Sequence, residues 1–285
     1  MTSSNQSGVG VTAPAAAPAL AEGAEQYVQC IERWGNESPI AASHEIEYGP
    51  HANQKLDVYF PPGRRCPLPI LVFFHGGAWI GGSRSWLRFM APAVTSLPAI
   101  FVAGTYRLAP TFRWPDQYED VCDAIAAVQA RAASFEGDAS RIVVGGHSAG
   151  GHLASLAVLK REIAPVRACF PISSSFNLQY GDVASDSAEN RVYKYLLKRR
   201  QQDFGASPIN FISGNRTPFH LAWGGKDFER ISRSGAEMAQ ALARDSAPVS
   251  FQVAPDAGHF DMHMRLRDPA REWYSTLRTA LAGET

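Results

Sequence analysis

Short apolar segments alternate with helical patterns along most of this chain. Residues 69–74 are apolar at every position, and similar short runs recur at 99–103, 141–144, 166–170, 219–223 and 249–253. A strand that is apolar throughout is typically covered on both faces. Because strands that alternate with helices form crossover connections, the sequence predicts an α/β protein with a mostly parallel central sheet and helices on both faces.

Two earlier segments have a different pattern, which indicates an edge of that sheet. Apolar and other residues take turns in 45–48 and in 56–60. A period of two places one face of a strand on the core, so we expect an antiparallel edge here. Helical patterns occupy the segments between the strands, and a first helix is expected near 21–34. The expected apolar helix faces comprise Val121, Ile125 and Val128 behind Pro115, Met238 with Leu242, and Trp273, Leu277, Ala280 and Leu281.

Residues 178–216 interrupt this rhythm with mixed polar residues and a basic run at Lys198, Arg199 and Arg200. A long excursion between core strands often covers a functional pocket, so we expect an inserted lid or cap, with a passive surface insertion as the alternative. The absence of internal repeats favours one domain over residues 22–285. Residues 1–21 are rich in Ser, Ala, Gly and Pro, a composition that predicts disorder.

Charge and cysteine content argue against several classes of partner and cofactor. The 285 residues carry 27 Lys plus Arg and 27 Asp plus Glu, which gives no general attraction to nucleic acid or to an anionic membrane. A signal-peptide pattern and a run of about 18 apolar residues are both missing, so we expect a cytoplasmic protein. Cys30, Cys66, Cys122 and Cys169 lack metal-ligand spacing, and neither a metal nor a cofactor is expected. The sequence leaves the oligomeric state open.

The strongest local signal is Gly146-His147-Ser148-Ala149-Gly150, a G-x-S-x-G sequence between an apolar strand and a helix-compatible run at 149–159. A nucleophile elbow requires this strand–turn–helix setting, because the sharp turn lifts the serine hydroxyl clear of the sheet. The flanking glycines permit the turn and a close packing that a Cβ would obstruct. We therefore expect Ser148 to be a catalytic nucleophile, with a helix N-cap of no catalytic role as the alternative.

A serine hydroxyl is a weak nucleophile, so Ser148 needs a base. After such an elbow, an acid and then a histidine follow along the chain. The sequence Asp256-Ala257-Gly258-His259-Phe260 comes after the last apolar strand, where a loop can carry the imidazole to the strand ends. We expect His259 to be the base, and His263 is its rival.

The acid is expected directly after the strand at 219–223, where the sequence ends in Asp227. A carboxylate at this position can accept the imidazole Nδ1–H, fix the tautomer and stabilise the imidazolium that forms. Glu229 and Asp256 are nearby alternatives for the same role.

A third segment, His75-Gly76-Gly77-Ala78-Trp79, follows the fully apolar strand. Backbone N–H groups of Gly76, Gly77 and Ala78 can point at a developing oxyanion, and the N–H of Ala149 would supply the opposing donor. The sequence does not rank the first three donors. His75 is expected to brace this loop rather than to act as an acid or base. All these parts lie at carboxyl ends of strands, where an open α/β sheet places its site.

Three motifs carry a resemblance to a known family: HGGAW at 75–79, YRLAP at 106–110 and GHSAGGH at 146–152. From about Leu56 to its end, outside 178–216, the chain resembles the hormone-sensitive-lipase-like esterases and the related kynurenine formamidases. The resemblance implies an α/β-hydrolase fold, no cofactor and the triad Ser148, Asp227 and His259. His147 stands where the esterase branch usually has Asp, and HGGAW and His259-Phe260-Asp261 look like the formamidase branch. YRLAP looks more like the esterase branch.

The resemblance therefore implies a serine hydrolase that cleaves an N-formyl or N-acyl amide, or a carboxylic ester, of a small metabolite, with aromatic metabolites among the candidates. An arylformamidase-like activity is the preferred interpretation, and a general carboxylesterase acting on short-chain esters is the alternative. Trp79, Trp86 and Phe176 are candidate pocket walls, although such aromatics are often plain core. A hydrolase-like binding protein without catalysis is a hypothesis of a different class. A lipid-interface lipase would require a more apolar lid than 178–216.

Overall fold

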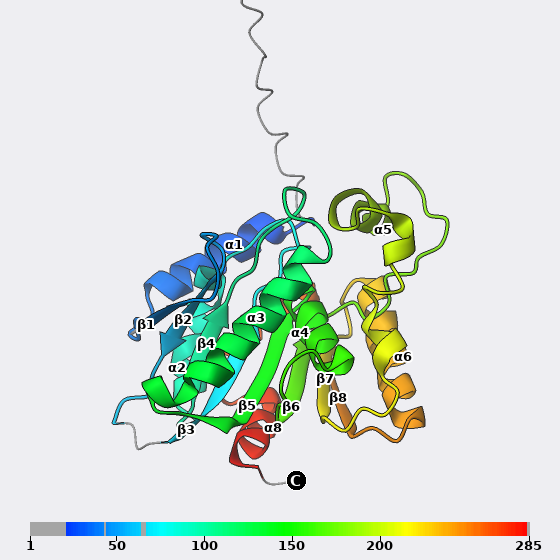
Figure 1. Ribbon diagram of the computed structural model, residues 1–285. Coiled ribbons are helices and arrows are strands. Elements are labelled where there is room, and N and C mark those ends of the chain that lie inside the picture. The colour runs from blue at the N-terminus through cyan, green and yellow to red at the C-terminus, as the bar shows by residue number, and fades with distance from the viewer. Residues whose placement is uncertain (1–20, 43, 64–66, 284–285) are drawn as a thin grey trace, which may run out of the picture.

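One eight-stranded sheet organises the computed structural model, which describes residues 21–42, 44–63 and 67–283 (Figure 1). The spatial order of the strands is β1-β2-β4-β3-β5-β6-β7-β8. Their bounds are β1 (His44–Glu47), β2 (Lys55–Tyr59), β3 (Leu68–Phe74), β4 (Ile100–Gly104), β5 (Gly137–His147), β6 (Ala168–Ile172), β7 (Phe219–Gly224) and β8 (Val249–Ala254). The prediction of disorder for 1–21 concerns residues that, apart from Ala21, lie outside this description, as does Cys66.

The directions of the strands confirm the two sequence patterns. β2 is antiparallel to both of its neighbours, β1 and β4. The pairs from β4 through β3, β5, β6, β7 and β8 are all parallel. The period-two segments therefore form an antiparallel edge, and the apolar runs form the parallel body of the sheet.

The uniformly apolar strand β3 lies at the centre and is covered on both sides. Ile70, Val72 and Phe74 belong to the core on one face, and Leu71 and Phe73 belong to the core on the other. All five side chains have no exposed surface. A strand covered in this way cannot tolerate polar alternation, which explains its continuous apolar sequence.

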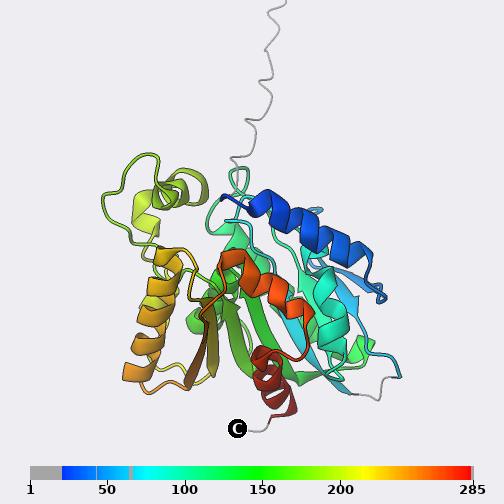
Figure 2. The ribbon, with the colours of Figure 1, turned by 180° about the vertical axis from the view of Figure 1, so that it is seen from behind.

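Helices cover both faces of the sheet, as the sequence predicts (Figures 1 and 2). Their apolar residues show that α3, α4 and α6 pack on one face and that α1, α2, α7 and α8 pack on the other. The bounds are α1 (Ala24–Asn36), α2 (Ala91–Thr95), α3 (Asp116–Arg131), α4 (Ala149–Lys160), α5 (Ala188–Arg191), α6 (Glu229–Arg244), α7 (His259–Met264) and α8 (Glu272–Ala282). The faces expected for α3, α6 and α8 are the buried ones, except for Ala280.

The last strand departs from the prediction. The sequence predicts that the run at 249–253, like the other apolar runs, is covered on both faces, but β8 lies at the edge of the sheet. Phe251 is 62% exposed and Val253 is 41% exposed. The sequence of this strand alternates Val, Ser, Phe, Gln and Val, which is a period of two. Among the described ring pairs, Phe251 stacks only with Trp223, with ring centroids 5.5 Å apart.

The insertion at 178–216 joins β6 to β7 and contains only short helical pieces. They are α5, a π-helix at Val192–Leu196 and 3-10 turns at Arg200–Gln202 and Pro208–Phe211. Figure 1 shows α5 standing beyond the sheet, above α6. Arg113 fastens the insertion from the loop before α3: its guanidinium donates to the carbonyl oxygens of Tyr195 at 3.0 Å and of Leu197 at 2.5 Å.

Candidate functional site

Ser148 lies on a sharp turn between β5 and α4. Its backbone has φ 53° and ψ −117°, a region that non-glycine residues rarely adopt, and it occupies the N-cap position of α4. The Ser148 N–H donates to the carbonyl oxygen of Ile172 at 2.8 Å, which ties the turn to β6. The strained backbone and the following helix are those expected of a nucleophile elbow.

Two glycines permit this turn because nothing larger fits. A Cβ on Gly146 would lie 2.4 Å from the carbonyl carbon of Gly150. A Cβ on Gly150 would lie 2.2 Å from the carbonyl oxygen of Phe74, in β3. The G-x-S-x-G pattern therefore reflects the close approach of α4 to the ends of β3 and β5.

The structure brings Ser148, His259 and Asp227 together from three separate loops. The Ser148 hydroxyl lies 3.1 Å from His259 Nε2, and His259 Nδ1 lies 2.8 Å from Asp227 Oδ1. With Nδ1–H donated to the carboxylate, Nε2 is free to accept the serine proton. The side chain of Asp227 has no exposed surface and that of His259 is 8% exposed, so the pair is largely shielded from water.

The environment of Asp227 keeps its carboxylate ionised. Burial raises the pKa of Asp227, but the hydrogen bond and charge of His259, the Ser173 hydroxyl and the Phe228 N–H together lower it by more. The resulting pKa lies below the ordinary value of an aspartate. An anion at this position orients the imidazole and stabilises it once it gains a proton.

The alternative residues lie elsewhere. His263 is buried, and its Nδ1 is hydrogen-bonded to the Tyr27 hydroxyl at 2.7 Å. Asp256 forms an ion pair of 2.6 Å with Arg265 at the surface, and Glu229 is exposed in the first turn of α6. Of the candidates that the sequence leaves open, only His259 and Asp227 form a hydrogen-bonded chain to Ser148.

The loop after β3 presents backbone donors to the same place. Gly77 and Ala78 line a cavity together with Ser148 and His259, and Gly76 does not line it. Within the described chain, no acceptor takes the N–H of Gly77 or Ala78. Ala149 opens α4, where the first N–H groups of a helix have no partner within it. The geometry therefore ranks Gly77 and Ala78 ahead of Gly76 as oxyanion donors opposite Ala149.

His75 braces this loop from behind, as the sequence predicts. Its Nδ1 lies 2.6 Å from the Gly76 carbonyl oxygen and must donate, so Nε2 accepts from the Thr105 hydroxyl at 2.9 Å. Burial lowers the pKa of His75 to about 4, which keeps it neutral. The Tyr106 hydroxyl donates to the His75 carbonyl oxygen at 3.0 Å. The first residue of the YRLAP motif thus supports the oxyanion loop.

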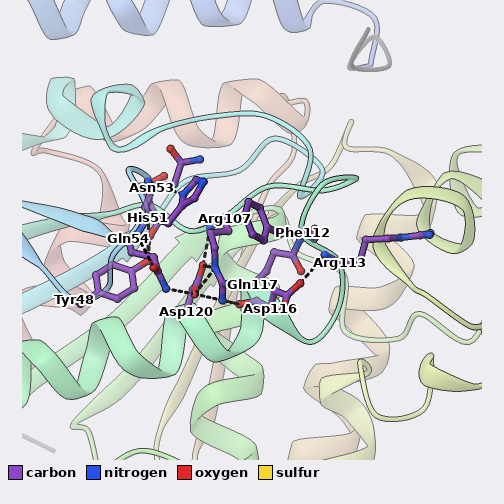
Figure 3. Close-up of polar contacts among 11 residues, drawn as sticks. Tyr48, His51, Asn53, Gln54, Arg107, Phe112, Arg113, Asp116, Gln117 and Asp120 are labelled. Atoms are coloured by element: carbon purple, nitrogen blue, oxygen red, sulfur yellow. Dashed lines mark hydrogen bonds and ion pairs between the residues drawn. The ribbon is translucent and has the colours of Figure 1, made fainter. Parts of the chain in front are cut away.

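The second residue of that motif anchors the segment to α3 (Figure 3). The Arg107 guanidinium lies 2.7 Å from Oδ1 of Asp120, a fully buried carboxylate, and the Arg107 backbone N–H donates to its Oδ2 at 2.8 Å. Gln54 donates to the same carboxylate at 2.8 Å. The buried charge is therefore paired and hydrogen-bonded on several sides, as a buried ion requires.

His147 supports the site from the other direction. Its Nε2 donates to the backbone carbonyl oxygen of His259 at 3.1 Å, and its ring stacks on His263 with centroids 4.9 Å apart. Burial, together with the charges of His259 and His263, lowers the pKa of His147 well below its ordinary value. A neutral imidazole therefore holds the loop that carries the base.

Two of the three aromatic residues expected at the pocket lie there. Trp79 lines a cavity of about 280 Å³ that contains Ser148, and Trp86 lines an adjoining one of about 60 Å³. Phe176 is only 2% exposed and packs in the core, and it is not among the described residues that line either cavity. Phe176 therefore corresponds to the plain-core alternative.

Several lining residues carry no signal in the sequence. The insertion supplies Tyr180, Ala188, Arg191, Val192, Tyr195 and Leu196 to the larger cavity. The insertion has no periodic pattern from which these contacts could be deduced. Arg230 lines both cavities, and the one sequence feature that could indicate its place at the site is its position three residues after Asp227.

The described residues contain no group of three or more His, Cys, Asp or Glu side chains that could hold a metal ion. Cys30, Cys122 and Cys169 are free thiols. Within the same part of the chain, no helix combines the length and apolar character needed to cross a bilayer.

Comparison with known proteins gives a consistent result. A family model described as "alpha/beta hydrolase fold" matches residues 71–263. The esterase LipC of Mycobacterium tuberculosis is 34% identical over 76% of this chain and 59% of its own length. Kynurenine formamidase of Danio rerio is 24% identical over 79% of this chain and 76% of its own. An esterase structure from Pyrobaculum calidifontis superimposes with a TM-score of 0.76 at 21% identity, over 91% of this chain and 92% of that one. The chain thus spans little more than half the length of LipC.

Proposed function

Because the chain belongs to the α/β-hydrolase fold family, we propose that it is a serine hydrolase that cleaves a carboxylic ester, or an N-formyl or N-acyl amide, of a small molecule. The observation that carries this proposal is the hydrogen-bonded chain from Ser148 through His259 to Asp227, which opens into a cavity of about 280 Å³. That cavity has the concave, largely apolar lining of a small-molecule site.

The proposed reaction follows from the positions of these groups. Ser148 Oγ attacks the substrate carbonyl carbon while His259 Nε2 takes its proton, and Asp227 stabilises the resulting imidazolium. The carbonyl oxygen becomes an oxyanion and accepts hydrogen bonds from the N–H groups of Gly77, Ala78 and Ala149. His259 then protonates the departing alcohol or amine, which leaves the acyl group on Ser148. Water attacks this acyl-enzyme while His259 takes its proton, and His259 returns the proton to Ser148 Oγ as the carboxylic or formic acid leaves.

Of the two substrate types, the comparisons favour the ester. LipC, an esterase, is 34% identical, whereas the formamidase relative is 24% identical. The sequence-based preference for an arylformamidase therefore becomes the second candidate. It keeps the support of His147, which holds the His259 loop, and of the formamidase's coverage, 76% of its length. An amide has the poorer leaving group, so protonation by His259 would matter more for it.

We propose further that residues 22–285 form a single domain in which 178–216 is a cap over the site. Arg113 holds the π-helix of the insertion, and His152 Nε2 donates to the Ala206 carbonyl oxygen at 2.7 Å. On its other side, His152 accepts a hydrogen bond of 3.2 Å from the indole of Trp79. These two ties support a cap fixed at its base rather than a freely opening lid.

The test is to measure kcat/KM side by side for 4-nitrophenyl acetate and N-formylaniline, with Ser148→Ala as the control. Preferential ester turnover that Ser148→Ala abolishes would support the carboxylesterase. Preferential formamide turnover would support the formamidase instead. If neither substrate is turned over and a bound small molecule is recovered unhydrolysed, the proposal is contradicted, and a hydrolase-like binding protein becomes the interpretation.

A further inference from the structure

Two cavities open on Ser148, and one charged residue borders both. The larger has a volume of about 280 Å³ and the smaller about 60 Å³. The residues common to their linings are Ala21, Ala78, Ser148, Phe228 and Arg230. A guanidinium therefore borders whichever cavity holds the acyl group and whichever holds the leaving group.

Among the described residues, neither cavity is lined by an Asp or a Glu. Asp227 is engaged by His259 and has no exposed side-chain surface. In a recess of lowered dielectric, an unbalanced cation attracts an anion more strongly than it would at an open surface.

No ion pair links Arg230 to an acid among the described residues. Its guanidinium lies 4.9 Å from the centre of the Phe228 ring, and Arg230 also borders a third cavity whose lining includes Glu189 and Glu237. Arg230 is half-buried in the first turn of α6, where the helix dipole adds positive potential.

Ser175, Tyr180 and Arg230 together form a polar part of the lining of the larger cavity. Burial raises the pKa of Tyr180 to about 12, the charge of Arg230 and the Ser175 hydroxyl lower it, and the charge of Glu189 raises it.

The rest of the larger cavity is apolar. Its lining includes Trp79, Ile80, Val192, Leu196 and Ile231. A ligand that fits both parts would place an apolar body on these side chains and a charged or polar group beside Tyr180 and Arg230. The planar guanidinium fork matches a carboxylate, to which it can donate two parallel hydrogen bonds.

We propose that the substrate carries a carboxylate group that Arg230 binds. This inference rests on the proposed function and narrows it to anionic esters or amides. Arg230 is then a specificity-determining residue, because it discriminates between a free acid and its neutral counterpart without contacting the reacting carbonyl.

Two matched pairs of esters test the proposal and show where the anion sits. In 4-acetoxybenzoate and its methyl ester the charge differs on the leaving group, and in mono-(4-nitrophenyl) glutarate and its methyl ester it differs on the acyl group. We expect the native protein to prefer the anion at least tenfold in kcat/KM within one pair. Arg230→Gln should lower that preference about 10- to 100-fold, since hydrogen bonds to charged groups are of that strength. Arg230→Lys should retain part of it.

Lys226→Gln is the matched control, because Lys226 is an exposed cation four residues earlier that lines neither cavity. It should leave both preferences unchanged. The proposal is overturned when Arg230→Gln lowers the rates for free acid and methyl ester equally. That result would assign Arg230 to positioning Phe228, whose ring lies 4.8 Å from that of His259.

A binding measurement separates this proposal from the proposed function. If the native protein hydrolyses no ester, calorimetric titration with benzoate and methyl benzoate still reports on the cavity. Binding of benzoate that Arg230→Gln weakens at least tenfold would support the anion site alone. Equal binding of the two compounds would overturn it.

Discussion

The carboxyl edge of the sheet and the insertion at 178–216 face each other across the same cavity, yet they are built differently. At the edge, Ser148 has a strained backbone and His259 and Asp227 are almost fully buried. The insertion consists of short helical pieces, and Phe204 within it is 55% exposed. The difference indicates a division of labour in which the edge sets the chemistry and the insertion, with the start of α6, sets the choice of substrate.

The largest effect is expected from a change at the edge. Asp227→Asn should lower kcat about 10⁴-fold, because the amide holds the wrong tautomer of His259 and cannot stabilise its protonated form. Steady-state kinetics on the best ester would measure this, and Asp256→Asn is the control, since Asp256 pairs with Arg265 instead. Near-normal rates for Asp227→Asn, or an equal loss for Asp256→Asn, would move the acid away from Asp227.

The buried histidines beneath the edge predict a pH dependence that the insertion, which has no histidine, cannot contribute. Burial lowers the pKa of His75 and His152 to about 4 and that of His263 to about 3. The unfolded chain takes up these protons near pH 6.5, whereas the folded chain does not. The free energy of unfolding should therefore have its full value above pH 7. Between about pH 6 and 4 it should fall by about 1.4 kcal/mol per pH unit for each of these groups.

Urea denaturation at several pH values measures this slope. His263→Gln keeps a side chain that can hydrogen-bond to the Tyr27 hydroxyl and removes one titrating group. The free energy of unfolding of this variant should change less steeply with pH than that of the native protein, by about 1.4 kcal/mol per pH unit. An unchanged slope would show that His263 does not contribute in this way.

The smallest effect is expected at the base of the insertion. Arg113→Gln removes the guanidinium that donates to the carbonyl oxygens of Tyr195 and Leu197. We expect KM to rise about two- to tenfold with kcat little changed, and proteolysis within 178–216 to become faster. Arg131→Gln is a matched control, because Arg131 also donates to a backbone oxygen, that of Glu47, outside the insertion. A fall in kcat without a change in KM would contradict the division of labour.

The sequence predicts the edge far better than the insertion, for a physical reason. Strands such as β3 and the turn at Ser148 are determined by local sequence: continuous apolar residues, and glycines where a Cβ would clash. The order of the motifs then places Ser148, Asp227 and His259 at one edge. The ranking of Gly77 and Ala78 over Gly76 as oxyanion donors depends on the conformation of their loop, for which the sequence has no recognisable pattern.

The failures have the same origin. Phe176 resembles a pocket residue in the sequence, but long-range packing buries it in the core. The run at 249–253 resembles a central strand, but its position at the edge follows from the order of the whole sheet. Arg191 and Tyr195 reach the cavity because the insertion folds back over the carboxyl edge of the sheet. The sequence of the insertion has no periodic pattern that predicts this conformation.

Covalent labelling tests whether Ser148 is the nucleophile of an acyl-transfer site. The native protein would be treated with a fluorophosphonate, a reagent that reacts with activated serines, and the adduct located by intact mass and peptide mapping. We expect one adduct per chain, on Ser148, and no adduct on a folded Ser148→Ala variant. An adduct on another residue, or a folded native protein that stays unlabelled, would contradict it.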